Sequence, residues 1–275
     1  MVAGYLLGLR EGLEAALILG VTFGVLHRMR RSELAPAAWL GVIIAVAVSV
    51  LAAAALLSIG AGLEGRAEQI FEGVTMLLAA GILTWMILWM RVQGRQVQVG
   101  FEQEVEQAAS RRQASAIFVV AFLAVMREGI ETALFLSAAA FQDAQTAVVL
   151  GGLAGIATAA VLGWGLYRAT IRLSVRRFLQ VTGWLLILFA AGLFAHGVHE
   201  FVEAGLLPAL IDPVWNTNAV LPEASPLGMV LRTLLGYNAD PTLLEVIAYI
   251  IYFAAVLAIQ RVMRDGKPAP VMATG

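Results

Sequence analysis

The chain consists largely of apolar runs long enough to cross a lipid bilayer as helices, and this feature limits its fold more than any other. A spanning helix needs about 20 mainly apolar residues, and backbone groups in hydrocarbon must pair within the helix itself. Hydrophobic residues make up 60% of the chain and charged residues only 13%, which excludes an ordinary soluble domain. We therefore predict an all-α polytopic membrane protein with seven transmembrane helices, at residues 4–26, 37–59, 70–90, 115–139, 147–167, 178–202 and 243–262.

Basic residues gather on alternate connections between these helices. Fourteen arginines and lysines fall on the connections at one side of the membrane, whereas only Arg66 and Arg232 fall on the other side. Cytoplasmic loops carry the excess of basic residues, so we expect the N-terminus outside and the C-terminus in the cytoplasm. The first run has no basic segment before it and is too long for a cleaved signal peptide, so we expect it to remain as a helix.

One charged pentapeptide occurs twice inside the apolar runs, as Arg-Glu-Gly-Leu-Glu at residues 10–14 and as Arg-Glu-Gly-Ile-Glu at residues 127–131. Ionisable side chains within a membrane are costly and usually functional. On a helix the two glutamates of each copy share one face, while the arginine is free to pair with another group. The glycine between them lets a neighbouring backbone or an ion come close. A second interpretation is a set of salt bridges that only lock helices together.

Three helices separate the two copies, so the first motif helix runs inward and the second runs outward. Ala-Ala-Gly at residues 79–81 of the third run recurs at residues 190–192 of the sixth. Inverted three-plus-three repeats are common in transporters, with the substrate site near the middle of the membrane. We therefore expect one transmembrane domain over residues 1–275, divided into repeat one (about 1–92), repeat two (about 113–205), an external loop (206–241) and a seventh helix (242–262).

The repeated motif supplies four carboxylates and two guanidiniums at similar depth, with a formal charge of −2. This charge cannot stay in hydrocarbon without a cation or protonation. Carboxylate oxygens alone favour hard cations such as ferric iron, and added imidazole shifts the preference toward ferrous iron, zinc or manganese. We therefore predict a metal translocation site at Glu11, Glu14, Glu128 and Glu131, whose charge is balanced by Arg10 and Arg127.

A second group of candidate ligands lies at the outer ends of the third and sixth runs. It comprises Glu68, Glu72, His196, His199, Glu200 and Glu203. The last four share one helical stripe, and the group predicts an outer vestibule that gathers cations. Solvated helix ends and the ligand set of an intramembrane metalloenzyme are two other interpretations. The order His-x-x-His-Glu differs from the His-Glu-x-x-His signature of zinc proteases, and the chain has neither a cysteine nor a P-loop motif.

The remaining segments support more local predictions. Residues 205–241 contain five prolines, too many for one long helix, yet residues 227–235 keep a helical period that predicts a short interfacial helix; an ordered loop is the alternative. Residues 91–113 are expected to form a solvated helical extension. We expect close helix packing at glycines spaced four apart, at Gly20 and Gly24 in the first run and at Gly151 and Gly155 in the fifth.

The doubled Arg-Glu-Gly-[Leu/Ile]-Glu sequence (the REGLE motif), together with Phe-Glu-Gly at 71–73 and Glu-Ala-Gly at 203–205, resembles the oxidase-linked high-affinity iron permease family, in its bacterial EfeU-like type. The resemblance covers nearly the whole chain. It implies a permease, not an enzyme, that carries ferric or ferrous iron across the bacterial inner membrane on the four motif glutamates. Iron is then the transported substrate, and no permanent cofactor is expected.

The resemblance also implies partners encoded elsewhere, namely a ferroxidase or peroxidase and a periplasmic iron-binding protein, besides iron itself and membrane lipid. Valine at position 202, where relatives tend to have glutamine, and the histidine pair at 196 and 199 depart from the family pattern. Lead-uptake permeases share the scaffold, so a permease for lead or another heavy or divalent metal is the alternative. A net charge of −1 gives no sign of nucleic-acid binding.

Overall fold

The computed structural model describes residues 1–110, 113–142, 144–167, 175–223 and 225–265, which form helices and loops without a strand. In chain order the elements are α1 (Val2–Arg28), the short 3₁₀ helix η1 (Ser32–Leu34), α2 (Ala35–Ala61), α3 (Arg66–Ser110), α4 (Ala114–Gln142), α5 (Gln145–Tyr167), α6 (Val175–Glu203), α7 (Pro226–Leu235) and α8 (Leu243–Asp265). Every apolar run predicted from the sequence lies within one of these helices. The prediction of an all-α protein is confirmed.

Within the described residues, five helices are long and apolar enough to cross a membrane. They are α2 together with η1, the part of α3 up to Met90, α5, the part of α6 from Val181, and α8. α1 and α4 are of similar length, but the duplicated motif puts three charged residues into the apolar run of each. Their charge, and not a shorter length, therefore separates α1 and α4 from the other five.

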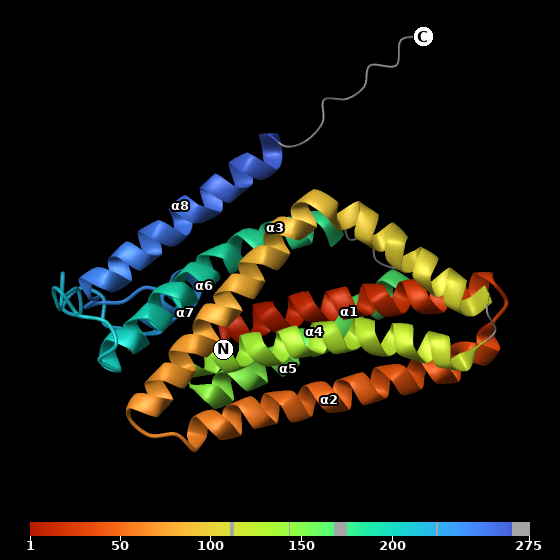
Figure 1. The fold of residues 1–275 in the computed structure, drawn as a ribbon, viewed down its shortest axis with the longest axis horizontal. Coiled ribbons are helices and arrows are strands. Elements are labelled where there is room, and N and C mark those ends of the chain that lie inside the picture. The colour runs from red at the N-terminus through yellow and green to blue at the C-terminus, as the bar shows by residue number, and fades with distance from the viewer. Residues whose placement is uncertain (111–112, 143, 168–174, 224, 266–275) are drawn as a thin grey trace, which may run out of the picture.

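The long helices pack in three pairs, α1 against α5, α2 against α4 and α3 against α6 (Figure 1). α1 also touches α4, so α1, α2, α4 and α5 run side by side as one bundle. The first part of α3 and the whole of α6 run obliquely to this bundle, and α8 lies on the outside of α6 (Figure 1). The first helix of the chain thus lies next to the fourth and the fifth.

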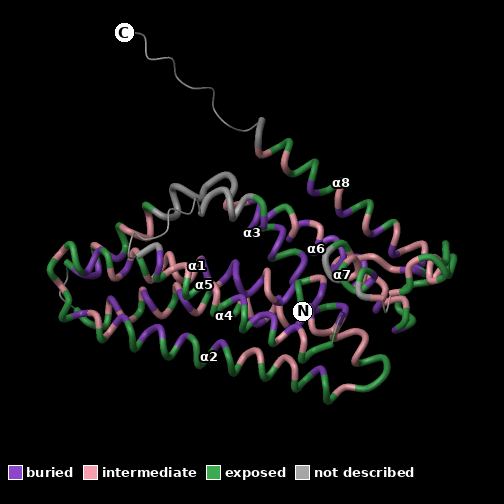
Figure 2. Tube along the Cα trace, turned by 180° about the vertical axis from the view of Figure 1, so that it is seen from behind, coloured by how far each residue is buried: buried purple, intermediate pink, exposed green. Residues whose placement is uncertain are grey.

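The outer faces of α2 and α8 are apolar. Exposed residues follow one another along both helices in Figure 2, and they include Ile43, Val50 and Leu51 of α2 and Ile250 and Ile251 of α8. An exposed apolar surface of this extent is a liability in water and marks contact with a membrane or another protein. These faces agree with helices that are surrounded by lipid.

Glycines allow α1 and α5 to approach backbone to backbone. A Cβ added at Gly8 would lie 2.2 Å from the carbonyl oxygen of Gly152, and one at Gly155 would lie 2.3 Å from the carbonyl oxygen of Tyr5. The expectation of close packing at Gly151 and Gly155 is therefore confirmed. It is wrong for the other two glycines, because in the described part of the chain no atom lies within 4 Å of such a Cβ at Gly20 or Gly24.

α3 continues as a polar helix beyond its apolar part and changes direction on the way (Figure 1). Arg28 at the end of α1 forms ion pairs with Glu102 at 2.7 Å and with Glu106 at 2.5 Å. The hydrogen bonds that Arg28 donates, first of all the one to Glu102, raise the pKa of Arg28 above its ordinary value. Val105 and Ala109, which adjoin these glutamates on the helix surface, are buried against α1, α2 and α4. The predicted solvated extension is thus helical but half embedded.

The proposed boundary of repeat one at about residue 92 falls inside α3, so the chain does not divide at that point into separate elements. Several basic residues used for the orientation lie outside the described residues, namely Arg111, Arg112, Arg168, Arg172 and Lys267.

The short helix predicted within the proline-rich segment is present as α7. The side chain of Ser225 caps its start by accepting a hydrogen bond from the backbone N–H of Gly228 at 3.0 Å. Gly236 ends it in the left-handed conformation with φ of 67°, which only glycine adopts without strain. α7 packs against α6 and touches α1. The helical interpretation of residues 227–235 is therefore right, and the ordered loop is wrong.

Candidate functional site

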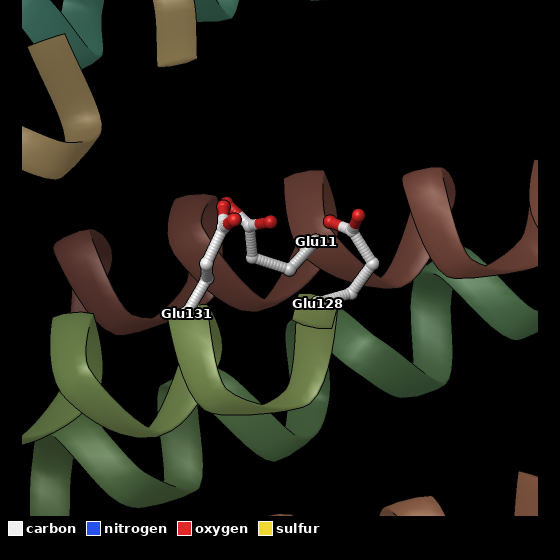
Figure 3. Close-up of side chains that lie close together, drawn as sticks. All are labelled: Glu11, Glu128 and Glu131. Carbon is white, nitrogen blue, oxygen red and sulfur yellow. The ribbon is translucent and has the colours of Figure 1, made fainter. Parts of the chain in front are cut away.

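The two copies of the duplicated motif meet where α1 contacts α4. One carboxylate oxygen each from Glu11, Glu128 and Glu131 lies within 4.8 Å of the others. Figure 3 shows these three side chains converging from the two helices. Sequence reasoning predicted that both motifs lie at compatible depth, and the structure brings three of the four motif glutamates together.

The three glutamates are withdrawn from the surface. Glu11 is 1% exposed and Glu128 7% exposed. The Oε2 atom of each of the three is buried and has no hydrogen-bond partner among the described residues. Buried carboxylate oxygens are normally paired with donors or cations. Carboxylate oxygens without a donor of their own can ligate a metal ion.

Glu14, the fourth motif glutamate, stands beside this group. Its Oε1 atom lies 2.9 Å from Nη2 of Arg10. It also interacts electrostatically with Glu131 and Arg127 of the other copy. Glu14 therefore belongs to the same charged cluster but is held by the arginine of its own motif.

Arg10 is almost completely enclosed, with 2% of its side chain exposed. Its Nη1 atom lies 2.6 Å from Oε1 of Glu11 and donates to the sulfur of Met86 at 3.7 Å. Its Nη2 atom faces Glu14 and donates to the sulfur of Met90 at 3.4 Å. The sequence left the arginine free to pair with another group. The structure instead pairs it with both glutamates of its own motif, from which it can balance their charge.

Arg127 occupies a more open position, with half of its side chain exposed. Its Nε atom donates to Oε1 of Glu131 at 2.9 Å. Its guanidinium carbon lies 5.7 Å from the ring centroid of Trp89 in α3, within range of a cation–π interaction. Among the described residues, no arginine lies within ion-pair distance of Glu128.

The glycine of each motif faces a neighbouring helix and not the carboxylates. A Cβ on Gly12 would lie 2.7 Å from Cβ of Ala159 in α5, and one on Gly129 would lie 2.0 Å from Oγ of Ser49 in α2. Of the two alternatives that the sequence allowed, close approach of a helix is therefore the one observed. The two glycines fix how tightly the motif helices pack on α5 and α2.

The outer group gathers at the adjoining ends of α3 and α6. His196 Nε2 lies 3.7 Å from Glu200 Oε1, and His199 Nε2 lies 3.2 Å from Glu203 Oε1. Gln69 of α3 donates to Glu203 of α6 at 3.2 Å and so links the two helices.

The carboxylates of Glu68 and Glu72 belong to the same acidic region, because both interact electrostatically with Glu200. The outer group does not form one compact metal site, however. Among the described residues, only Glu11, Glu128 and Glu131 bring three ligand atoms within 4.8 Å of one another. The outer group therefore consists of neighbouring histidine–glutamate pairs in an acidic region.

Sequence reasoning missed Glu245, which α8 adds to the outer group. Its Oε2 atom lies 3.4 Å from Nδ1 of His199, and Asn238 donates to both of its oxygens at 3.0 Å. Thr242 accepts a hydrogen bond from the backbone N–H of Glu245 at 3.3 Å. The Thr-x-x-Glu pattern at residues 242–245 is a helix-capping signature, so the position of Glu245 could have been found from the sequence.

A small cavity adjoins this outer group. Its volume is about 30 Å³, room for about one or two water molecules. It is lined by Gln142, Gly192, His196, Glu223, Arg232, Gly236, Tyr237, Asn238 and Glu245.

Sequence reasoning also missed the contacts of Met86, Trp89 and Met90 with the motif arginines. No sequence signal separates such residues from ordinary apolar packing.

Residues 1–266 match the family described as iron permease FTR1. The chain is 36% identical over 259 residues to the ferrous iron permease EfeU of Escherichia coli O157:H7, a match that covers 94% of each chain. It is 35% identical over 260 residues to the ferrous iron permease EfeU of Yersinia pestis, covering 94% of this chain and 92% of that one. No solved structure matches.

Proposed function

This chain belongs to the iron permease FTR1 family, and from that membership we propose that it carries iron inward through the carboxylates of its two Arg-Glu-Gly-x-Glu motifs. Members of the family are iron permeases, so the chain is a multi-pass membrane transporter and not an enzyme. This leaves the metalloenzyme interpretation without support. The observation that carries the proposal is the convergence of Glu11, Glu128 and Glu131 within 4.8 Å.

Electrostatics explains why such a site takes up a cation. The four motif glutamates and two motif arginines leave a formal charge of −2 in a buried region. An unpartnered buried acceptor costs about 1–3 kcal/mol, and a charged one costs more. A cation ligated by Glu11, Glu128 and Glu131 gives each free oxygen a partner and cancels the excess charge.

Iron is the ion that fits both the ligands and the relatives. The group consists of carboxylate oxygens only, which suit hard and intermediate cations. The two EfeU relatives are named as ferrous iron permeases, which favours iron as the substrate. We take iron as the transported ion, with lead and other divalent metals as the competitors to be tested.

We also propose seven membrane-spanning helices, with α1 to α3 and α4 to α6 as inverted repeats, the N-terminus outside and the C-terminus inside. The packing supports the repeat, because α1 lies on α5 whereas its counterpart α4 lies on α2, the counterpart of α5. Gly12 and Gly129 mark equivalent contacts in the two pairs. The distribution of arginine and lysine supports the orientation.

The membrane potential is sufficient to drive uptake in this orientation. An ion that moves inward gains about 2.3 kcal/mol per charge for each 100 mV. Ferrous iron therefore gains roughly 4.6 kcal/mol and ferric iron roughly 7 kcal/mol at that potential. No nucleotide-hydrolysing domain is needed on energetic grounds.

The outer histidines and glutamates serve, in this proposal, to gather the ion before it reaches the motif glutamates. Their placement in an acidic region at the shared end of α3 and α6 supports this function. An entrance on the outer side of the protein is also accessible to partner proteins. We propose a ferroxidase or peroxidase and a periplasmic iron-binding protein as the source of the ion.

The test is uptake of radioactive iron by the purified protein in liposomes with an imposed potential. Glu11→Gln and Glu131→Gln should each abolish uptake, because they keep the side-chain size but remove a ligand charge. Glu104→Gln, at an exposed position of α3, is the matched control and should leave uptake unchanged. Normal uptake by the Glu11 and Glu131 variants would overturn the proposed site, and stronger inhibition by lead than by unlabelled iron would overturn the choice of ion.

A further inference from the structure

The guanidinium of Arg10 is enclosed between two kinds of acceptor. Each terminal nitrogen faces one carboxylate of α1 and one thioether of α3: Nη1 lies between Glu11 and Met86, and Nη2 lies between Glu14 and Met90. The arrangement is therefore matched on both nitrogens. A methionine pair that served only to fill space would have no reason to place both sulfurs at the two donor groups.

Arg10 also lies within the electrostatic field of the whole carboxylate cluster. It interacts electrostatically with Glu11 and Glu14 and, across the helix contact, with Glu128 and Glu131. A transported ion and the guanidinium therefore draw on the same four carboxylates. Binding of the ion to Glu11 weakens the hold of that carboxylate on Arg10, so the guanidinium needs another acceptor nearby.

We propose that Met86 and Met90 are positioning residues of the carboxylate site. Their sulfurs hold the Arg10 guanidinium beside Glu11 and Glu14, and they retain it when the transported ion takes over those carboxylates. This inference rests on the proposed function, since it presumes that an ion binds at the motif glutamates. It adds a role for α3, which contributes no residue to the duplicated motif.

Thioethers suit this task better than other side chains. A sulfur accepts a weak hydrogen bond and is polarisable, but it carries no charge that would compete for the ion or hold the arginine too strongly. A hydrocarbon in its place would leave buried N–H groups of Arg10 without a partner as soon as the carboxylates turned to the ion. A carboxylate in its place would fix the guanidinium permanently.

The experiment compares two double variants in iron uptake by the purified protein in liposomes. Met86→Leu/Met90→Leu removes both acceptors and nearly conserves volume. Met86→Gln/Met90→Gln retains a neutral acceptor on a side chain of similar length. Met76→Leu is the matched control, because Met76 is fully buried in the same helix but lies about 15 Å from Met86 along the helix axis.

If the sulfurs act as acceptors, the leucine pair should raise the iron concentration at half-maximal uptake about fivefold or more, as expected for the loss of weak hydrogen bonds to a buried charge. The glutamine pair should stay within about twofold of the unaltered protein, and so should Met76→Leu. A packing role predicts the reverse order, because leucine fits an apolar contact and glutamine does not. Should either pair fail to fold, the single variants at each position make the same comparison.

Three results have distinct meanings. Unchanged half-saturation in the leucine pair, or equal changes in the leucine and glutamine pairs, would overturn the role of the sulfurs while iron uptake by the unaltered protein stands. No iron uptake by the unaltered protein above that of empty liposomes would overturn the proposed function itself and this inference with it. A raised half-saturation in the leucine pair alone supports both.

Discussion

The two copies of the pentapeptide share their sequence but not their surroundings. In each copy the arginine pairs with the glutamate four residues later at 2.9 Å, so this contact follows from helix geometry alone. Arg10, however, is 2% exposed and bound by a second glutamate and two sulfurs, whereas Arg127 is 50% exposed and faces a tryptophan ring. The difference comes from α3, which covers one arginine and only borders the other.

This difference gives the two motif copies different charge environments within one site. In the first copy every glutamate has an arginine beside it, and in the second copy Glu128 has none within ion-pair distance among the described residues. In the described part of the chain, the one motif carboxylate without a close arginine therefore lies on the α4 side. We expect the first copy to be the more important for folding and the second to be the more important for attracting the cation.

The largest effect of this asymmetry is expected when each arginine is replaced. Arg10→Met leaves two buried carboxylates unpaired and should destabilise the protein by about 3–5 kcal/mol. Arg127→Met removes a half-exposed arginine from its pair with Glu131 and should cost about 1 kcal/mol or less. Unfolding in detergent, followed by circular dichroism, measures both values. Equal losses for the two variants would show that the copies are energetically equivalent.

The next test concerns the motif glycines and their helix contacts. Gly12→Ala and Gly129→Ala each force a methyl group into an occupied position and should destabilise by about 1–3 kcal/mol. Ala159→Gly should rescue the first variant and Ser49→Gly the second, but not the other way round. The same unfolding measurement applies, and cross-rescue would contradict the pairing of α1 with α5 and of α4 with α2.

A smaller effect, of opposite sign, is expected at Glu128. Glu128→Gln removes the buried carboxylate that has no arginine within ion-pair distance among the described residues, so the variant should be roughly 1 kcal/mol more stable while iron uptake is lost. Glu14→Gln is the contrast, because it breaks an ion pair with Arg10 and should lose both stability and uptake. A loss of stability in Glu128→Gln would mean that the charge on the α4 side is compensated after all.

The smallest expected effect is that of the tryptophan beside Arg127. Trp89→Leu should lower the free energy of unfolding by about 0.5–1 kcal/mol through loss of the cation–π contact. In the Arg127→Met background the same substitution should cost less by that amount. The double-mutant cycle isolates this contact, and additive losses would show that the ring and the guanidinium do not interact.

The sequence was sufficient for the parts of the structure that depend on polarity and helix period. Apolar runs of about 20 residues predicted the helices because the membrane leaves few other solutions. The spacing of the two motifs predicted that their glutamates would come to similar depth, and Glu11, Glu128 and Glu131 do converge. The helical period of residues 227–235 predicted α7.

The sequence was insufficient wherever a result depended on which helix faces which. Gly20 and Gly24 have the same spacing as Gly151 and Gly155, yet among the described residues only the second pair lies close against another helix. In the sequence Met86 looks like any apolar core residue. Only the position of α3 in the fold brings its sulfur to Arg10. Spacing along one helix indicates which residues share a face, but not what lies opposite that face.

The exchange of partners among α1, α2, α4 and α5 restricts how this transporter can change shape. With α1 seated on α5 and α4 seated on α2, each half of the chain holds a helix of the other half in contact close enough to exclude even a methyl group. Two halves interlocked in this way cannot rock against each other as rigid bodies without breaking both contacts. We therefore expect any rearrangement during transport to involve α3 and α6, which run obliquely to the bundle and carry Met86, Trp89 and Met90 beside the motif arginines and the histidines and glutamates of the outer group.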